Sequence, residues 1–324
     1  MEQLFDMPHN RIRLIVFVVA AVMVPSTVFS TEGDDRILQA VAETKKLIDH
    51  DQINAAQDIF DELQADFPKI VRPDLDLFIQ GEMHYGKNRY SKAVKSFEKL
   101  LTEYPRTSLS EAALDREFTI AKAYLAGRKK TVFGFIKLKG YAEGVRIMEK
   151  ITDRVGLDST RGTEASLAVA KNYEQRELYN EAYLKWWEIS LEWDHGPVGK
   201  EALLGMARSK LEAYKQQPEY KRHLFDTSGL NTAKSCYARF KLLYPVDARQ
   251  FDVDRIVEKI DEQLAYKQLS IGQYYQSTGH DKAANLYYRM VVNDWPDTQA
   301  AQTAKEQLAD HPDTESNHQT PPEK

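Results

Sequence analysis

The segment from Gly81 to Thr107 carries the pattern of hydrophobic and polar positions on which the rest of the chain is built. In this segment Ala93, Phe97 and Pro105 lie at relative offsets of 0, 4 and 12. A small residue one turn before a large aromatic residue suits the tight seam between two antiparallel helices, and a proline ends the second helix. The pattern therefore predicts one helical hairpin over this segment.

The same triplet recurs along the chain. The clear copies are Ala56, Phe60, Pro68; Ala233, Tyr237, Pro245; and Ala284, Tyr288, Pro296, and the weaker copies are Gly144, Met148, Gly156 and Ala182, Trp186, Asp194. The anchor positions 56, 93, 144, 182, 233 and 284 are separated by 37, 51, 38, 51 and 51 residues. The longer spacings add 14 residues, about four turns at about 3.6 residues per turn, so we expect longer helices in the same register. The recurrence predicts an all-α solenoid of about six helical hairpins over residues 31–309.

The two ends of the chain have a different composition from the repeats. Arg11 and Arg13 precede an apolar run from Leu14 to Val24, and permissive residues follow up to Ser30. This order is typical of a secretory signal peptide over residues 1–30, and the run is shorter than the roughly 20 residues that span a bilayer. A retained signal anchor is the alternative. The polar, proline-bearing residues 310–324 are expected to be disordered.

A basic and aromatic segment interrupts the repeats between Gly127 and Gly140. Its basic residues are Arg128, Lys129, Lys130, Lys137 and Lys139, and its aromatic residues are Phe133 and Phe135. Such a segment suits peripheral contact with anionic lipid headgroups or binding of an acidic partner strand. Alternatively, the apolar side chains dock on the neighbouring hairpin while the lysines remain solvated.

Two single residues invite a functional interpretation. Trp187 follows the core residue Trp186, and successive helical residues point about 100° apart, so Trp187 must face elsewhere. Packing against an adjacent repeat is favoured over display in a binding groove. Cys236 is the single cysteine, and we expect a small buried hydrophobic residue there, with a reactive thiol as the alternative.

Composition and motifs favour a protein without catalytic chemistry. The net charge is -5, which gives no support to nucleic-acid binding. The eight histidines form no zinc motif, and no Gly-x-Ser-x-Gly sequence is present. The segment Gly81–Asn88 mimics a phosphate-binding loop but lacks the required serine or threonine after Lys87. We therefore expect no enzyme activity, no metal or other cofactor and no small-molecule substrate.

The last hairpin resembles the tetratricopeptide repeat family. The residues that match the family pattern are Gly272, Tyr275, Gly279, Ala284, Tyr288 and Pro296. The hairpin endings Tyr104–Pro105 and Trp295–Pro296, each followed by polar residues, are similar to those of the BamD family of outer-membrane assembly factors. The expected export signal and the number of hairpins agree with this resemblance.

The resemblance implies a scaffold in the periplasm or at the periplasmic face of the outer membrane. Its partners would be a barrel-assembly protein and nascent outer-membrane proteins. One departure is that no cysteine directly follows the apolar run, so the family's lipid anchor is not expected here. Another exported tetratricopeptide adaptor, serving cell-wall, division or polysaccharide-export complexes, is the main alternative. An enzyme or its regulatory subunit is a third.

Overall fold

The computed structural model describes residues 32–132 and 136–311, which fall into two compact units, up to Asp66 and from Phe67. In the first unit, α1 (Glu32–Asp49) and α2 (Ile53–Asp66) pack as a hairpin. The expected signal peptide, residues 133–135 with Phe133 and Phe135, and tail residues 312–324 lie outside the described residues. Asp310 closes the last helix, so the array extends one residue beyond its predicted end.

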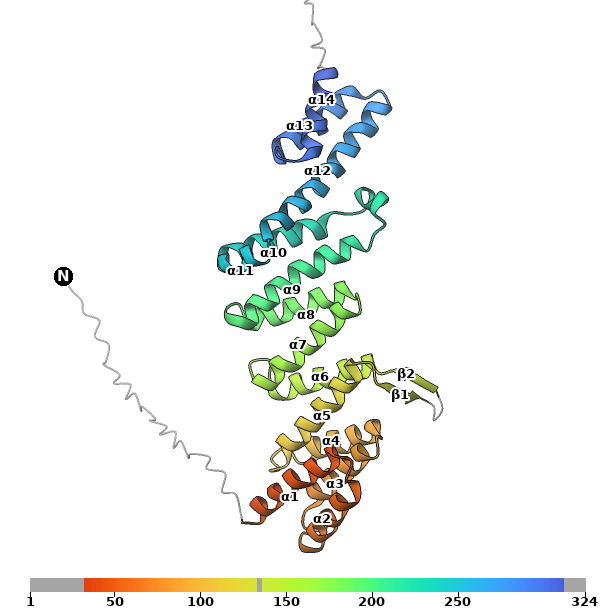
Figure 1. Ribbon diagram of the computed structural model, residues 1–324, viewed down its shortest axis with the longest axis vertical. Coiled ribbons are helices and arrows are strands. Elements are labelled where there is room, and N and C mark those ends of the chain that lie inside the picture. The colour runs from red at the N-terminus through yellow and green to blue at the C-terminus, as the bar shows by residue number, and fades with distance from the viewer. Residues whose placement is uncertain (1–31, 133–135, 312–324) are drawn as a thin grey trace, which may run out of the picture. The chain divides into compact units, whose positions relative to one another are not determined.

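In the second unit, consecutive helices pack against one another in chain order (Figure 1). They are α3 (Pro73–Gly86), α4 (Tyr90–Glu103), α5 (Ser110–Leu125), α6 (Tyr141–Val155), α7 (Thr160–Gln175), α8 (Tyr179–Glu192), α9 (Gly196–Lys215), α10 (Ser228–Leu243), α11 (Pro245–Gln250), α12 (Val253–Ser277), α13 (Asp281–Asp294) and α14 (Gln299–Asp310). A 3₁₀ turn, Glu219–Leu224, separates α9 from α10. The predicted helical-hairpin solenoid is confirmed.

The extra residues between repeats are accommodated in different ways. The helix α12 has 25 residues where α3 has 14, so lengthening occurs there as expected. Between α5 and α6 the expectation is wrong, because the insertion forms an antiparallel ribbon of β1 (Lys129–Val132) and β2 (Ile136–Lys139). In β2 apolar and basic residues alternate as Ile-Lys-Leu-Lys, with the period of a strand.

Prolines fix where several helices end. The residue before a proline is driven out of the helical region by contact with the proline ring. Tyr104, Tyr244 and Trp295 accordingly have φ of -128°, -132° and -137°. The helices α4, α10 and α13 therefore end two residues before Pro105, Pro245 and Pro296.

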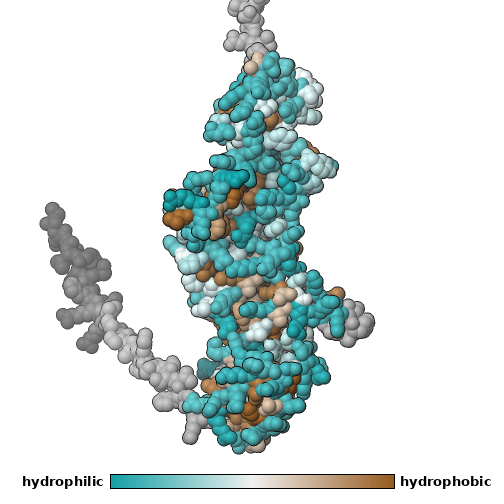
Figure 2. All heavy atoms as spheres, viewed as in Figure 1, coloured by the Kyte–Doolittle hydropathy of each residue, from teal (hydrophilic) through white to brown (hydrophobic). Residues whose placement is uncertain are grey.

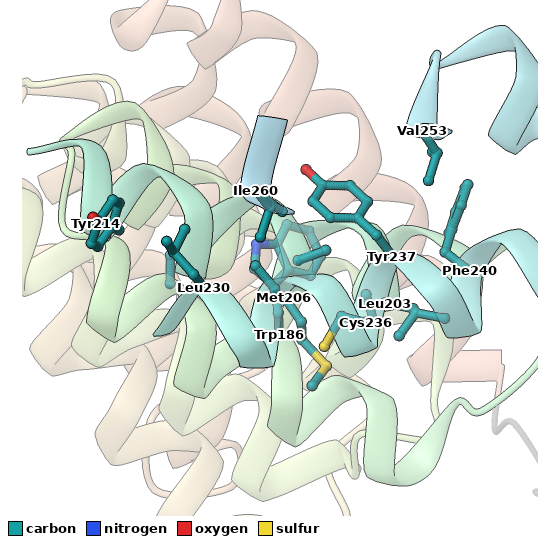
Figure 3. Packing of buried hydrophobic residues seen from close by; sticks show 14 of the residues in the cluster. Trp186, Leu203, Met206, Tyr214, Leu230, Cys236, Tyr237, Phe240, Val253 and Ile260 are labelled. Carbon is teal, nitrogen blue, oxygen red and sulfur yellow. The ribbon is translucent and has the colours of Figure 1, made fainter. Parts of the chain in front are cut away.

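The buried residues fill the seams between neighbouring helices. The alanine and aromatic members of the triplets are buried at Ala56, Phe60, Ala93, Phe97, Ala182, Trp186, Ala233, Tyr237, Ala284 and Tyr288. Trp186, Met206 and Tyr237 belong to one core cluster shared by α8, α9 and α10 (Figure 3). Cys236 is buried in the same cluster, as expected of a small hydrophobic residue.

Candidate partner-binding surface

The ribbon leaves the end of α5 and returns to α6, projecting from the stacked helices (Figure 1). Lys129 lies opposite Lys139, and Lys130 lies opposite Leu138. The Lys130 ammonium lies 2.6 Å from a Glu143 carboxylate oxygen on α6. Because successive residues of a strand point to opposite faces, the other face carries Lys129, Lys137 and Lys139, all exposed.

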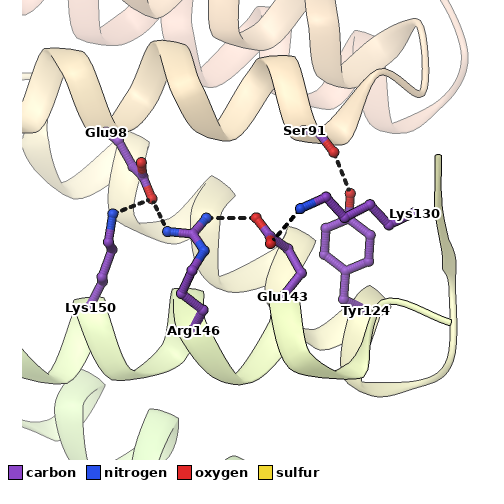
Figure 4. Close-up of polar contacts among 7 residues, drawn as sticks. All are labelled: Ser91, Glu98, Tyr124, Lys130, Glu143, Arg146 and Lys150. Carbon is purple, nitrogen blue, oxygen red and sulfur yellow. Dashed lines mark hydrogen bonds and ion pairs between the residues drawn. The ribbon is translucent and has the colours of Figure 1, made fainter. Parts of the chain in front are cut away.

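An ionic network anchors the base of the ribbon (Figure 4). Arg146 donates to Glu143 at 2.6 Å and to Glu98 on α4 at 2.8 Å, and Lys150 donates to Glu98 at 3.0 Å. Although burial acts to raise the pKa of Glu143, the hydrogen bonds from Arg146 and Lys130 hold it below its usual value. Burial likewise acts to raise the pKa of Glu98, but its hydrogen bonds with Arg146 and Lys150 lower it. Glu98 and Glu143 therefore stay charged and link α4, α6 and β1.

A second group of cations lies where the ribbon meets the turn between α3 and α4. The Arg128 guanidinium stacks over the Tyr90 ring, 4.5 Å from its centroid, and donates to Asn88 Oδ1 at 3.2 Å. Arg89, Lys92, Arg128 and Lys129 line a hollow of about 310 Å³ with Asn88, Tyr90, Ser91 and Tyr124. We call the exposed cations of the ribbon and of this hollow together the basic surface. Its members are Arg89, Lys92, Arg128, Lys129, Lys137 and Lys139.

The pKa of His84 on α3 is affected by burial and by an excess of positive charge around it. Burial lowers the pKa of His84, and the neighbouring charges of Lys92, Arg89 and Lys87 lower it further. Lys87 and Arg89 lie in the turn between α3 and α4, and Lys92 lies in the first turn of α4. The sequence analysis did not assign any of the three to a binding surface. Their close spacing between positions 87 and 92 is the signal that points to them.

The structure places only some of the predicted contact residues on the basic surface. Arg128, Lys129, Lys137 and Lys139 contribute to the basic surface, whereas Lys130 is held in an internal ion pair. Leu138 is 56% exposed, so this apolar side chain does not dock on the neighbouring hairpin. Trp187 on α8 is 47% exposed, against the favoured expectation that it packs on an adjacent repeat. The face shown in Figure 2 is otherwise mostly hydrophilic, with small hydrophobic patches.

The basic surface suits electrostatic binding. In the described ranges, no group of three or more His, Cys, Asp or Glu side chains could hold a metal ion. None of the helices in this part of the chain is long and apolar enough to cross a membrane. The surface offers ammonium and guanidinium donors, which bind carboxylates and phosphates.

Two segments of the chain match models of known protein families. Residues 77–107 match the family model described as a tetratricopeptide repeat, and residues 200–313 match the YfiO model, described as an outer membrane lipoprotein. No curated protein matches. The second match extends from α9 to the residues just after α14.

Solved structures also align with most of the chain. PilW, a widely conserved type IV pilus biogenesis factor, is 15% identical with a TM-score of 0.31, over 83% of this chain and 98% of its own. A tetratricopeptide repeat protein from Parabacteroides merdae is 13% identical with a TM-score of 0.35, over 85% of this chain and 98% of its own.

The stacked hairpins and the two family matches define a tetratricopeptide repeat protein. Proteins of this class present extended surfaces that bind other proteins. Within the class, this chain resembles BamD, and the resemblance is carried by α9 to α14.

Proposed function

We propose that the chain is a non-catalytic periplasmic scaffold that binds protein partners during outer-membrane protein assembly. The observation that carries this proposal is the match of residues 200–313 to the outer membrane lipoprotein family. The partners are a barrel-assembly protein and nascent outer-membrane proteins. Export is attributed to the signal peptide predicted over residues 1–30.

The repeat architecture supports a binding role. Within the second unit each helix packs against its chain neighbours, and stacked repeats present side chains of several hairpins to one partner. The basic surface combines residues from the α3–α4 turn with the ribbon between α5 and α6. The cations of this surface are ammonium and guanidinium groups, which bind carboxylates and phosphates of a partner.

Crosslinking in intact cells tests the proposal. The tagged protein is crosslinked in its native envelope, purified under denaturing conditions and analysed by mass spectrometry. We expect enrichment of a barrel-assembly protein, with crosslinks mapping to α9–α14, relative to samples without crosslinker. Absence of outer-membrane assembly proteins from reproducibly crosslinked samples would contradict the proposal.

A second candidate is an exported tetratricopeptide adaptor for cell-wall, division or polysaccharide-export complexes. It is favoured by one observation: residues 32–199, including the ribbon, lie outside the outer membrane lipoprotein match. The same experiment separates the two candidates, because crosslinks dominated by cell-wall or division proteins would support the adaptor.

A further inference from the structure

We propose that the outer edge of β2 binds an extended acidic segment of a partner protein as a third strand. The segment carries acidic side chains two residues apart, opposite Lys137 and Lys139. This inference deepens the proposed function and rests on its scaffold role. It commits to a protein partner, and anionic lipid is treated as the competing outcome.

The register of the ribbon identifies the free backbone groups. Gly140 N–H donates to the Arg128 carbonyl at 2.9 Å, so these two residues form a hydrogen-bonded position. Because bonded and non-bonded positions alternate in an antiparallel pair, Lys139 opposite Lys129 and Lys137 opposite Thr131 are non-bonded. Residues at such positions direct their N–H and C=O groups away from the partner strand.

The outer edge of β2 is therefore a template for another strand. The sheet has two strands, and no further strand of residues 32–132 or 136–311 pairs with it. An added strand would hydrogen-bond to the outward backbone groups of Lys137 and Lys139. This is the β-augmentation mode, in which backbone bonds give affinity and alternate side chains give specificity.

The charges at this edge are unbalanced. Lys129 and Lys139 are directly opposed at a non-bonded position, where Cβ atoms are about 4.5–5.5 Å apart and like charges destabilise the pair. Lys129, Lys137 and Lys139 form no ion pair with the described carboxylates. The Lys139 ammonium lies 5.5 Å from the Tyr141 ring centroid. A carboxylate supplied by a partner would relieve the repulsion.

The two observations together define the partner. A strand paired with β2 would place side chains opposite Lys137 and Lys139 on the lysine-bearing face, because directly opposed residues share a face. Glutamate or aspartate at alternate positions therefore matches both lysines while the backbones pair. Lipid headgroups would neutralise the lysines but leave the strand edge unpaired, so a peptide satisfies more of the observed groups.

Fluorescence anisotropy with synthetic peptides tests the proposal on the full chain. The probe peptide has about six residues, a common strand length, and alternates glutamate with valine. One control has the same composition with consecutive glutamates, and another carries N-methyl groups on the backbone nitrogens that would face β2. We expect the alternating peptide to bind about tenfold more tightly than either control.

Charge reversal provides the matched protein variants. Lys137→Glu/Lys139→Glu should weaken binding of the alternating peptide about tenfold or more. Lys282→Glu/Lys305→Glu changes the net charge equally at exposed lysines of α13 and α14 and should leave binding unchanged. Circular dichroism should show the same helix content for all three proteins.

Three outcomes would overturn the inference. Equal binding of the three peptides would show charge attraction without strand pairing, and equal binding by both reversed proteins would place the site elsewhere. Phosphatidylglycerol vesicles that sediment the native chain but not the Lys137→Glu/Lys139→Glu protein, with no peptide binding, would identify a lipid surface. Each leaves the proposed function standing if crosslinking still captures a barrel-assembly protein.

Discussion

Glycines face aromatic rings at the tightest contacts between helices. A Cβ on Gly272 would lie 2.6 Å from the Tyr288 ring, so only hydrogen fits. We predict that Gly272→Ala lowers the free energy of unfolding by about 1–3 kcal/mol through overpacking, measured by chemical denaturation. The matched control is Gly229→Ala on α10, where the nearest atom to a new Cβ is 3.8 Å away. An equal loss of unfolding free energy in both variants would contradict the close packing of Gly272 against Tyr288.

A buried ion pair joins α3 to α5. Arg116 donates to both carboxylate oxygens of Glu82, at 2.7 and 2.6 Å, and stacks on Tyr85 at 4.0 Å. Glu82→Gln leaves the guanidinium without its counter-charge and should cost about 3–5 kcal/mol of stability, measured by urea denaturation. Glu82→Leu/Arg116→Met should recover most of that loss. A double variant as unstable as Glu82→Gln would contradict this explanation.

Glu117 gives the fold a pH dependence. Burial, reinforced by the charge of Glu98, raises its pKa from 4.5 to about 8, and its Oε1 has no hydrogen-bond partner in the described residues. The unfolded carboxyl ionises near 4.5, whereas the folded one stays protonated to about 8. Ionisation of Glu117 therefore opposes folding. As the pH rises from 4.5 to about 8, the free energy of unfolding should fall by up to about 1.4 kcal/mol per pH unit.

Denaturation of Glu117→Gln between pH 5 and pH 8 checks this assignment. The neutral amide keeps the shape of the protonated acid, so the variant should lose this component of the pH dependence. It should match the native protein near pH 5 and exceed its stability near pH 8. Parallel pH profiles for the two proteins would show that Glu117 does not titrate in this range.

At the scale of elements, the ribbon is an appendage of the helical array. Its described side-chain links to the helices are few, namely the part-buried Lys130–Glu143 ion pair and the contact of Lys139 with the Tyr141 ring. We predict that replacing residues 129–139 by a short glycine-serine turn changes the melting temperature little, measured by circular dichroism. Removing the same number of residues from α4, whose Phe97 is buried, should abolish cooperative unfolding.

Sequence reasoning predicted the helical hairpins because their determinants are local. The alanine and the aromatic residue lie one turn apart in one helix, and the proline lies just beyond the end of that helix. The strands of the ribbon were not predicted, although the alternation of apolar and basic residues in β2 is visible in the sequence. Period-two alternation over so few residues is a weak signal beside strong helical repeats.

The basic surface could be predicted only in part. Arg128, Lys129, Lys137 and Lys139 stand out in sequence, but the cations at positions 87–92 come from another hairpin. The repeat pattern of the sequence does not show that the cations of the α3–α4 turn lie beside those of the ribbon. The internal role of Lys130 likewise depends on Glu143, 13 residues away.

At the scale of the whole molecule, local charge matters more than net charge. The chain has a net charge of -5, yet one surface concentrates cations. Screening over about 8 Å at physiological ionic strength makes a partner respond mainly to nearby groups. A negative protein can therefore bind an acidic segment at the basic surface.

The most direct test of the central claim measures outer-membrane protein assembly after depletion of this protein. Semi-denaturing electrophoresis separates folded barrels from unfolded ones, and a soluble periplasmic protein serves as the control. We predict that the folded fraction of several barrel proteins falls while the control is unchanged. An unchanged folded fraction in fully depleted cells would contradict a role in outer-membrane protein assembly.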